Sequence, residues 1–246
     1  MNSGSRTEKS SRKSSSVLGK RDRAILDDVV HYRLITNDWV LARHLTGAKP
    51  NAAVKVTGRL CRDGWLEGHS FTRRKRYFTA GTRLVKQRGL PLARTRPLGT
   101  QSLAMRIAVL RYCLSGEKGS SASQRFTLSS QDEMRVAFPW LPPTILHKAN
   151  VLSGDETHRT WRILRVDLGG RPDHVVRKCV GDLTPLAECP EFPQLLAERR
   201  FIYVFLTASR HKKRTIEQAL ADRPWPSGIQ FQIGLVCELA ELIATS

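Results

Sequence analysis

Along the first hundred residues, short groups of apolar side chains are separated by polar turns, and their spacing predicts helices. A first helix is predicted over residues 20–35, where apolar residues recur on one face at Ile25, Val29 and Tyr32. Thr36 or Asn37 provides the N-cap of a second helix. The apolar residues that dock this second helix on the first are Trp39, Val40, Leu41 and Leu45.

A third helix is predicted from Pro50 to Asp63, after a turn that contains Gly47. Its apolar face, expected in the core, consists of Ala53, Val56 and Leu60. The other face is small and basic, with Lys49, Asn51, Ala52, Lys55, Arg59 and Arg62. Such a helix fits the major groove of DNA. Taken alone, the pattern is explained equally well by an ordinary solvated surface helix.

A β-hairpin is predicted directly after this helix. Asp63 and Gly64 end the helix, one strand begins at Trp65, and the other returns over residues 76–79. The tip carries four consecutive cations, Arg73, Arg74, Lys75 and Arg76. Like charges repel, so this cluster is most easily explained when DNA phosphates neutralise it. The order of elements predicts a winged helix-turn-helix DNA-binding domain over residues 20–88, which a short helix after Thr79 or Gly81 completes.

The remaining chain predicts a second domain over residues 102–246, after a linker with two prolines and two glycines at residues 89–101. Strands are predicted over residues 146–152, 160–168, 201–206 and 229–236, and the third of these is fully apolar and therefore buried. Helices are predicted over residues 102–114, 131–138, 173–183, 190–199 and 209–220. The first of these is expected to have one apolar face, formed by Leu103, Ile107, Leu110 and Leu114. The expected fold is thus an α+β winged helix followed by an α/β domain with a mixed sheet.

The charge distribution supports a polyanionic partner. The 246 residues carry a formal net charge of +19, of which residues 1–100 carry +15 and residues 101–246 carry +4. We therefore expect nucleic acid to bind the N-terminal part. Residues 1–19 form a polar, basic and Ser-rich tail that is expected to be disordered, either as a solvated leader or as a DNA-contacting arm.

The sequence predicts no cofactor, metal or membrane span. Its five cysteines form no CxxC pair, which argues against a zinc site or a disulfide framework and favours reduced thiols. No run of about 18 apolar residues or secretory signal is present. We expect a cytoplasmic, nucleoid-associated protein.

One acidic residue, Asp167, lies at the end of the predicted strand 160–168, a position that suggests metal-dependent chemistry. A nuclease of the restriction type needs two carboxylates and a lysine around a metal ion. Gly169 stands where that lysine is expected, and Lys178 lies on the next predicted helix. We therefore predict no enzymatic activity, with a metal-dependent nuclease as the alternative.

The layout of the chain resembles the replication-relaxation family of plasmids and integrative mobile elements. The resemblance rests on residues 35–38 (ITND), 59–66 (RLCRDGWL), 77–81 (YFTAG), 165–169 (RVDLG) and 201–209 (FIYVFLTAS). It implies a winged helix fused to a restriction-endonuclease-like domain without a full catalytic set. It also implies DNA binding in plasmid replication or transfer, or in transcription control within such an element.

These observations predict a sequence-specific double-stranded DNA-binding protein that acts as a homodimer. Transcription regulation in a bacterial mobile element is the first hypothesis, and a plasmid replication or mobilisation accessory role is the second. The predicted major-groove residues are Lys49, Asn51, Lys55 and Arg59, with Arg62 beside them. The residues predicted to contact the backbone or minor groove are Arg73, Arg74, Lys75 and Arg76.

Overall fold

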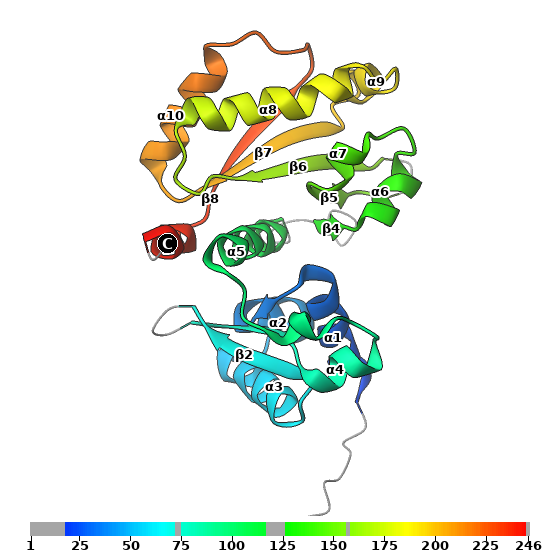
Figure 1. Cartoon of the computed structure of the whole chain (residues 1–246), viewed down its shortest axis with the longest axis vertical. Coiled ribbons are helices and arrows are strands. Elements are labelled where there is room, and N and C mark those ends of the chain that lie inside the picture. Colours follow the sequence, from blue (N-terminus) through cyan, green and yellow to red (C-terminus); the bar gives the residue numbers. More distant parts are fainter. Residues whose placement is uncertain (1–17, 72–74, 117–125, 156–157, 245–246) are drawn as a thin grey trace, which may run out of the picture.

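The computed structural model describes residues 18–71, 75–116, 126–155 and 158–244, and its fold is α+β (Figure 1). Residues 18–98, called here the N-terminal unit, contain short helices and a small antiparallel sheet. Residues 100–244, the sheet unit, contain a five-stranded mixed sheet with helices on both faces. Among the described residues, no helix is both long and apolar enough to cross a membrane.

The helices of the N-terminal unit largely follow the predicted pattern. They are α1 (Lys20–Tyr32), α2 (Asn37–His44), α3 (Pro50–Arg62) and α4 (Thr82–Gln87). The first helix ends three residues earlier than predicted, because Arg33 adopts a left-handed conformation with φ of 73°. Thr36 then caps α2, as expected, by accepting a hydrogen bond from the backbone N–H of Trp39 at 3.3 Å.

The predicted hairpin is present as β2 (Leu66–Ser70) and β3 (Arg76–Ala80), paired antiparallel. Its ladder continues towards the tip, where the N–H of Phe71 donates to the carbonyl of Lys75 at 3.1 Å. A third strand, β1 (Ile35–Thr36), was not predicted; it pairs with β3 and gives the order β1-β3-β2. The hairpin is therefore anchored to the segment between α1 and α2.

The segment predicted as a linker, residues 89–101, contains a 3-10 helix, η1 (Leu92–Thr95), and is hydrogen bonded to the small sheet. The hydroxyl of Thr79 donates to the carbonyl of Thr95 at 3.2 Å, and the N–H of Leu98 donates to the hydroxyl of Tyr77 at 3.1 Å. The chain thus stays attached to β3 until α5 begins.

The large sheet has the strand order β4-β5-β6-β7-β8. Its strands are β4 (Thr127–Ser129), β5 (Ala149–Ser153), β6 (Thr160–Val166), β7 (Phe201–Thr207) and β8 (Gln230–Leu235). The pairs from β4 to β6 are antiparallel, and those from β6 to β8 are parallel. The prediction of a mixed sheet with a buried strand at residues 201–206 is confirmed, whereas β4 was not predicted.

Helices cover both faces of this sheet (Figure 1). On one face, α8 (Pro172–Ala187) and α10 (Arg210–Ala221) pack against Trp161, Ile163 and Tyr203. On the other, α5 (Thr100–Ser115) and α11 (Glu238–Ala244) pack against Leu164 and Val204. The shorter helices are α6 (Gln131–Ala137), α7 (Pro143–Leu146) and α9 (Phe192–Ala197). Of these, α7 occupies a Pro-rich stretch for which the sequence predicted no helix.

The core below the sheet continues into the N-terminal unit through α5. This helix was predicted to be apolar on one face, but its buried residues surround most of it: Leu103, Ala104, Ile107, Ala108, Val109, Leu110, Tyr112 and Cys113. A helix that is apolar on nearly all sides is stable only when enclosed. Here the N-terminal unit and the sheet enclose it, so both share one hydrophobic cluster.

Gly81→Ala is expected to destabilise the protein. A Cβ atom at Gly81 would press on the carbonyl oxygen of Gly64 and lie 2.8 Å from the backbone nitrogen of Leu66. Backbone atoms cannot rotate away, so the free energy of unfolding should fall by about 1–3 kcal/mol in urea denaturation. Gly181→Ala in α8 is the matched control, because among the described residues nothing outside the adjacent backbone of α8 lies within 4 Å of its Cβ position. The free energy of unfolding of this control should rise by about 0.5–1 kcal/mol. Equal changes in the two variants would contradict the packing described around Gly81.

Candidate nucleic-acid interface

One side of α3 is open to solvent and carries polar and basic side chains. Asn51, Lys55 and Arg62 are exposed along it, and Lys49 is exposed at its N-cap. Val54, with 51% of its surface exposed, and Gly58 lie between them. The three predicted core residues on the opposite side, Ala53, Val56 and Leu60, are buried as expected. The exposed stripe thus combines hydrogen-bond donors, one apolar contact and a position without a side chain.

The position of α3 is set by its contacts with α2 and with β2. Gly47, with φ of 81°, makes the turn after α2, and Pro50 opens α3 at a position where no backbone N–H is needed. The buried Thr57 hydroxyl donates to the side-chain oxygen of Asn37 at 2.9 Å. At the other end, the N–H of Trp65 donates to the carbonyl of Leu60 at 2.9 Å. The helix is therefore held to α2 near its middle and to the start of the hairpin at its C-terminal end.

Arg59 lies at the edge of the exposed stripe, because it forms an ion pair inside the N-terminal unit. Its Nη2 donates to both carboxylate oxygens of Asp22 at 2.8 Å. Asp22 is 5% exposed, so its charge is compensated mainly by this arginine. A base contact by Arg59 remains a prediction, and it would require breaking or sharing this pair. The partner lies 37 positions earlier on α1, which no local pattern in the sequence reveals.

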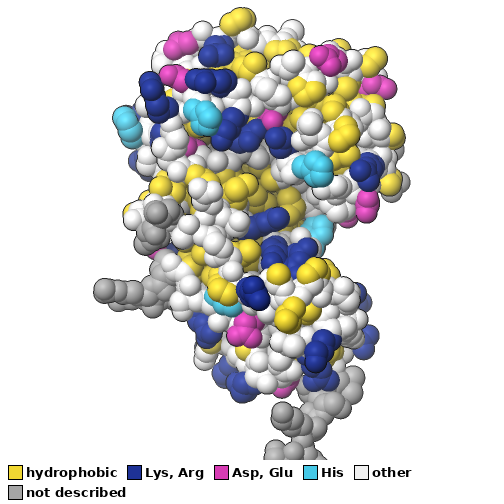
Figure 2. All heavy atoms as spheres, in the orientation of Figure 1, with side chains coloured by type: hydrophobic (Ala, Val, Ile, Leu, Met, Phe, Trp, Pro, Cys, Tyr) yellow, Lys and Arg dark blue, Asp and Glu magenta, His cyan; other side chains and the backbone are white. Residues whose placement is uncertain are grey.

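The described part of the hairpin places Lys75 and Arg76 at the surface. The guanidinium of Arg76 lies across the strand over Gly68, where a Cβ atom would be 2.5 Å from its Nη2. It also lies 5.8 Å from the centre of the Phe78 ring. Arg73 and Arg74, predicted at the same tip, lie outside the described residues. Figure 2 shows Lys and Arg side chains spread over this lower part of the molecule.

A network of ion pairs connects the hairpin to the sheet unit. Glu238, at the start of α11, lies 3.4 Å from Lys75 and 2.7 Å from Arg111 of α5. Arg111 also lies 2.6 Å from Asp38 of α2. Burial alone would raise the pKa of Glu238, but its backbone hydrogen bond, Arg111 and Lys75 together lower it. Neither Glu238 nor Arg111 was singled out from the sequence.

Asp167 is buried, and its carboxylate is hydrogen bonded within the sheet unit. It is 3% exposed and directly follows β6. One of its oxygens accepts a hydrogen bond from the N–H of Gly169 at 3.1 Å, and the other accepts one from the hydroxyl of Thr207 at 3.1 Å. The carboxylate thus closes the turn after the strand. In the described part of the chain, no three His, Cys, Asp or Glu side chains are grouped to hold a metal ion.

Comparison with known proteins found no match among protein-family models, curated proteins or solved structures.

The Glu238 network should make stability depend on pH. The pKa of Glu238 is lowered in the folded protein. Its contribution is therefore complete above the unfolded pKa and is lost as the pH falls through the folded pKa. We expect Glu238→Gln to lower the free energy of unfolding by about 1–3 kcal/mol at pH 7, and the difference from the unchanged protein to shrink towards pH 3.

Urea denaturation across this pH range is the measurement. The control is Glu217→Gln, which removes an exposed carboxylate of α10 that is 3.6 Å from Lys213 and should change stability by less than about 0.5 kcal/mol. A difference between Glu238→Gln and the unchanged protein that persists undiminished at pH 3 would argue against an electrostatic role.

Proposed function

We propose that this protein binds double-stranded DNA in a sequence-specific manner through its N-terminal unit, which acts as a winged helix-turn-helix. In this proposal α3 enters the major groove and the β2–β3 hairpin is the wing. The observation that carries it is the exposed stripe of Asn51, Lys55 and Arg62 on α3, next to a hairpin rich in cations. The concentration of net charge, +15 of +19, in residues 1–100 supports the same partner.

The chemistry of the stripe suits base recognition. The 13 residues of α3 span about 20 Å, enough to follow a groove over several base pairs. Lys55 and Arg62 can donate to guanine, Asn51 can pair with adenine, and Val54 can contact a thymine methyl group. Gly58 has space above it, because in the described chain, apart from the adjacent backbone of α3, only the Arg62 guanidinium lies within 4 Å of its Cβ position. The helix backbone can therefore approach the bases closely there.

The biological setting is proposed from the resemblance to the replication-relaxation family. We propose transcription regulation within a bacterial mobile element, acting as a homodimer, because a single module makes few contacts with DNA. A role as a plasmid replication or mobilisation accessory factor would use the same interface. Occupancy across the genome separates the two, since promoters favour the first and an origin or transfer site favours the second.

For the sheet unit we propose a restriction-endonuclease-like domain that does not cleave DNA. Its mixed sheet with helices on both faces is compatible with that fold. Both oxygens of Asp167 are engaged with Gly169 and Thr207, and Lys178 is exposed on α8. Supercoiled plasmid incubated with the protein and Mg²⁺ or Mn²⁺ should stay intact. Nicking that Asp167→Ala abolishes would establish the nuclease alternative instead.

The binding test starts with selection of sites from random double-stranded DNA, which should enrich one motif, with two-fold symmetry if a dimer binds. Lys55→Ala and Arg62→Ala should each reduce the preference for that motif over random DNA by about 1–3 kcal/mol, measured by fluorescence anisotropy. Lys55 and Arg62 are better test positions than Arg59, because replacing Arg59 would leave Asp22 buried without its main partner and could destabilise the fold. Lys178→Ala, an exposed cation on α8, is the control and should have no effect.

The role of the hairpin as a wing is tested by measuring how the affinity for DNA depends on salt concentration. The test variant replaces Arg73, Arg74 and Arg76 by Gln and keeps Lys75, which pairs with Glu238. It should bind all DNA sequences more weakly, and to the same extent. The slope of log affinity against log salt should flatten by about 0.9 for each DNA phosphate that the variant no longer neutralises. Full affinity of this variant at both low and high salt would refute the winged-helix assignment.

A further inference from the structure

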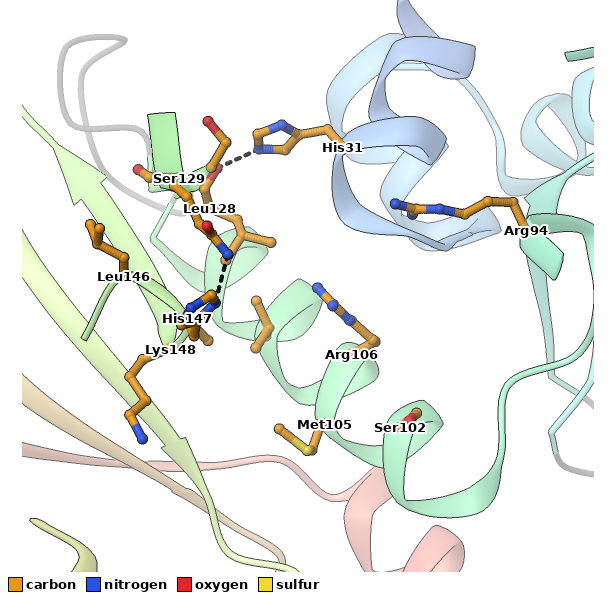
Figure 3. A pocket seen from close by; sticks show the side chains of 14 residues that line it. His31, Arg94, Ser102, Met105, Arg106, Leu128, Ser129, Leu146, His147 and Lys148 are labelled. Carbon is orange, nitrogen blue, oxygen red and sulfur yellow. Dashed lines mark hydrogen bonds between the residues drawn. The ribbon is translucent and has the colours of Figure 1, made fainter. Parts of the chain in front are cut away.

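A cavity of about 460 Å³ lies between the N-terminal unit and the sheet unit (Figure 3). Its walls come from α1, η1, α5, β4 and the segment between α7 and β5. None of the 14 residues that line it is Asp or Glu. Its cationic and titratable lining residues are His31, Arg94, Arg106, His147 and Lys148. Figure 2 shows Lys, Arg and His side chains gathered where the N-terminal unit meets the sheet unit.

Two arginines reach the same space from different elements. Figure 3 shows the side chains of Arg94 of η1 and Arg106 of α5 both extending into the cavity. In the described chain neither forms an ion pair or a side-chain hydrogen bond. Arg106 is exposed to solvent on one side, and its pKa is lowered by partial burial and by the charge of Arg94. Two like charges that face the same space repel each other, and an anion bound between them would offset that repulsion.

A third arginine stands beside them. The pKa of Arg33, at the end of α1, is lowered by burial and then by Arg94 and Arg106, so all three charges act on one another. Its Nη2 donates to the carbonyl of Ala93 at 3.0 Å. Its Nη1 is buried and has no hydrogen-bond partner in the part of the chain described. A buried donor without a partner favours a nearby acceptor, although Arg33 itself does not line the cavity.

The other basic residues of the lining already have partners. Lys148 lies 3.2 Å from Asp182 and points away from the arginines in Figure 3. The ring of His31 is hydrogen bonded to the carbonyl of Leu128, and that of His147 lies 2.8 Å from the side-chain amide of Gln131. The positive charge without a partner is thus concentrated at Arg94 and Arg106. Arg33 lies close enough to interact with both but does not line the cavity.

We propose that this cavity binds a small phosphate-bearing molecule with an apolar or aromatic body, about the size of a mononucleotide. The guanidinium groups of Arg94 and Arg106 can bind phosphate through paired hydrogen bonds. The apolar lining for the body is Met105, Val109, Leu128 and Leu146. The volume falls in the range of small-molecule sites. This site contains no residue of α3 or of the hairpin, so it is independent of the DNA interface proposed above.

The test is isothermal titration of the full-length protein with AMP, inorganic pyrophosphate and adenosine. AMP and pyrophosphate should bind, and adenosine, which has the same body without the phosphate, should not. Arg94→Gln and Arg106→Gln should each weaken AMP binding by about ten- to a hundredfold, as expected for loss of a charged hydrogen bond. Arg177→Gln is the matched control, because this arginine is exposed on α8, outside the cavity lining.

A second measurement separates loss of binding from loss of folding. Without ligand, Arg106→Gln should unfold at the same or a higher temperature than the unchanged protein, because it removes repulsion from Arg94. With saturating AMP the order should reverse. Failure of both AMP and pyrophosphate to bind, or binding that survives both substitutions, would overturn the proposal. So would variants that bind AMP normally but lose DNA affinity as Lys55→Ala does, because the arginines would then contact DNA.

Discussion

The arrangement of the whole molecule depends on the burial of α5 on both of its sides. One side packs under the sheet against Leu164 and Val204, and the other packs on the N-terminal helices within the same hydrophobic cluster. A helix with apolar residues around most of its surface cannot leave either neighbour without exposing them to water. The N-terminal unit is therefore held in a defined place under the sheet. Both proposed binding sites depend on that placement, because the cavity lies beside α5 and the hairpin contacts α11 through Lys75.

Ion pairs across this junction link the proposed DNA interface to the sheet unit. Arg111 of α5 contacts Asp38 at the start of α2, and Glu238 contacts both Arg111 and Lys75. A phosphate that approaches Lys75 must compete with a carboxylate that is already 3.4 Å away. Conversely, displacing Glu238 would leave Arg111 with one carboxylate partner fewer. If the hairpin contacts DNA as proposed, those contacts are coupled by charge to the position of α11.

Elements with a clear period or cap could be predicted from the sequence, whereas those created by distant contacts could not. The cap of α2 at Thr36, the buried face of α3 and the inner strand β7 all follow from local spacing. By contrast, β1 and β4 have two and three residues, too few to display a period, and exist only because a neighbouring strand pairs with them. For α5, the large residues suggested a single apolar face, and the second buried side consists mostly of small ones such as Ala104 and Ala108. For the candidate interface, spacing identified Asn51, Lys55 and Arg62, but not the Asp22 partner that holds Arg59.

Internal ion pairing also changes what the strong basic charge of the N-terminal part means. Net charge counts every cation alike, yet in the folded protein several are paired: Arg59 with Asp22, Arg88 with Asp27, and Lys75 with Glu238. Such pairs contribute to internal structure and release few counterions when DNA binds. The cations most available to an anionic partner are those that have no carboxylate partner in the folded protein. Among the described residues, these include Lys55 and Arg62 on the open side of α3, and Arg94 and Arg106 in a cavity that α3 does not reach. The DNA partner proposed above accounts for the first pair, whereas the second pair lines a separate cavity between the two units and is assigned to the proposed phosphate-bearing ligand.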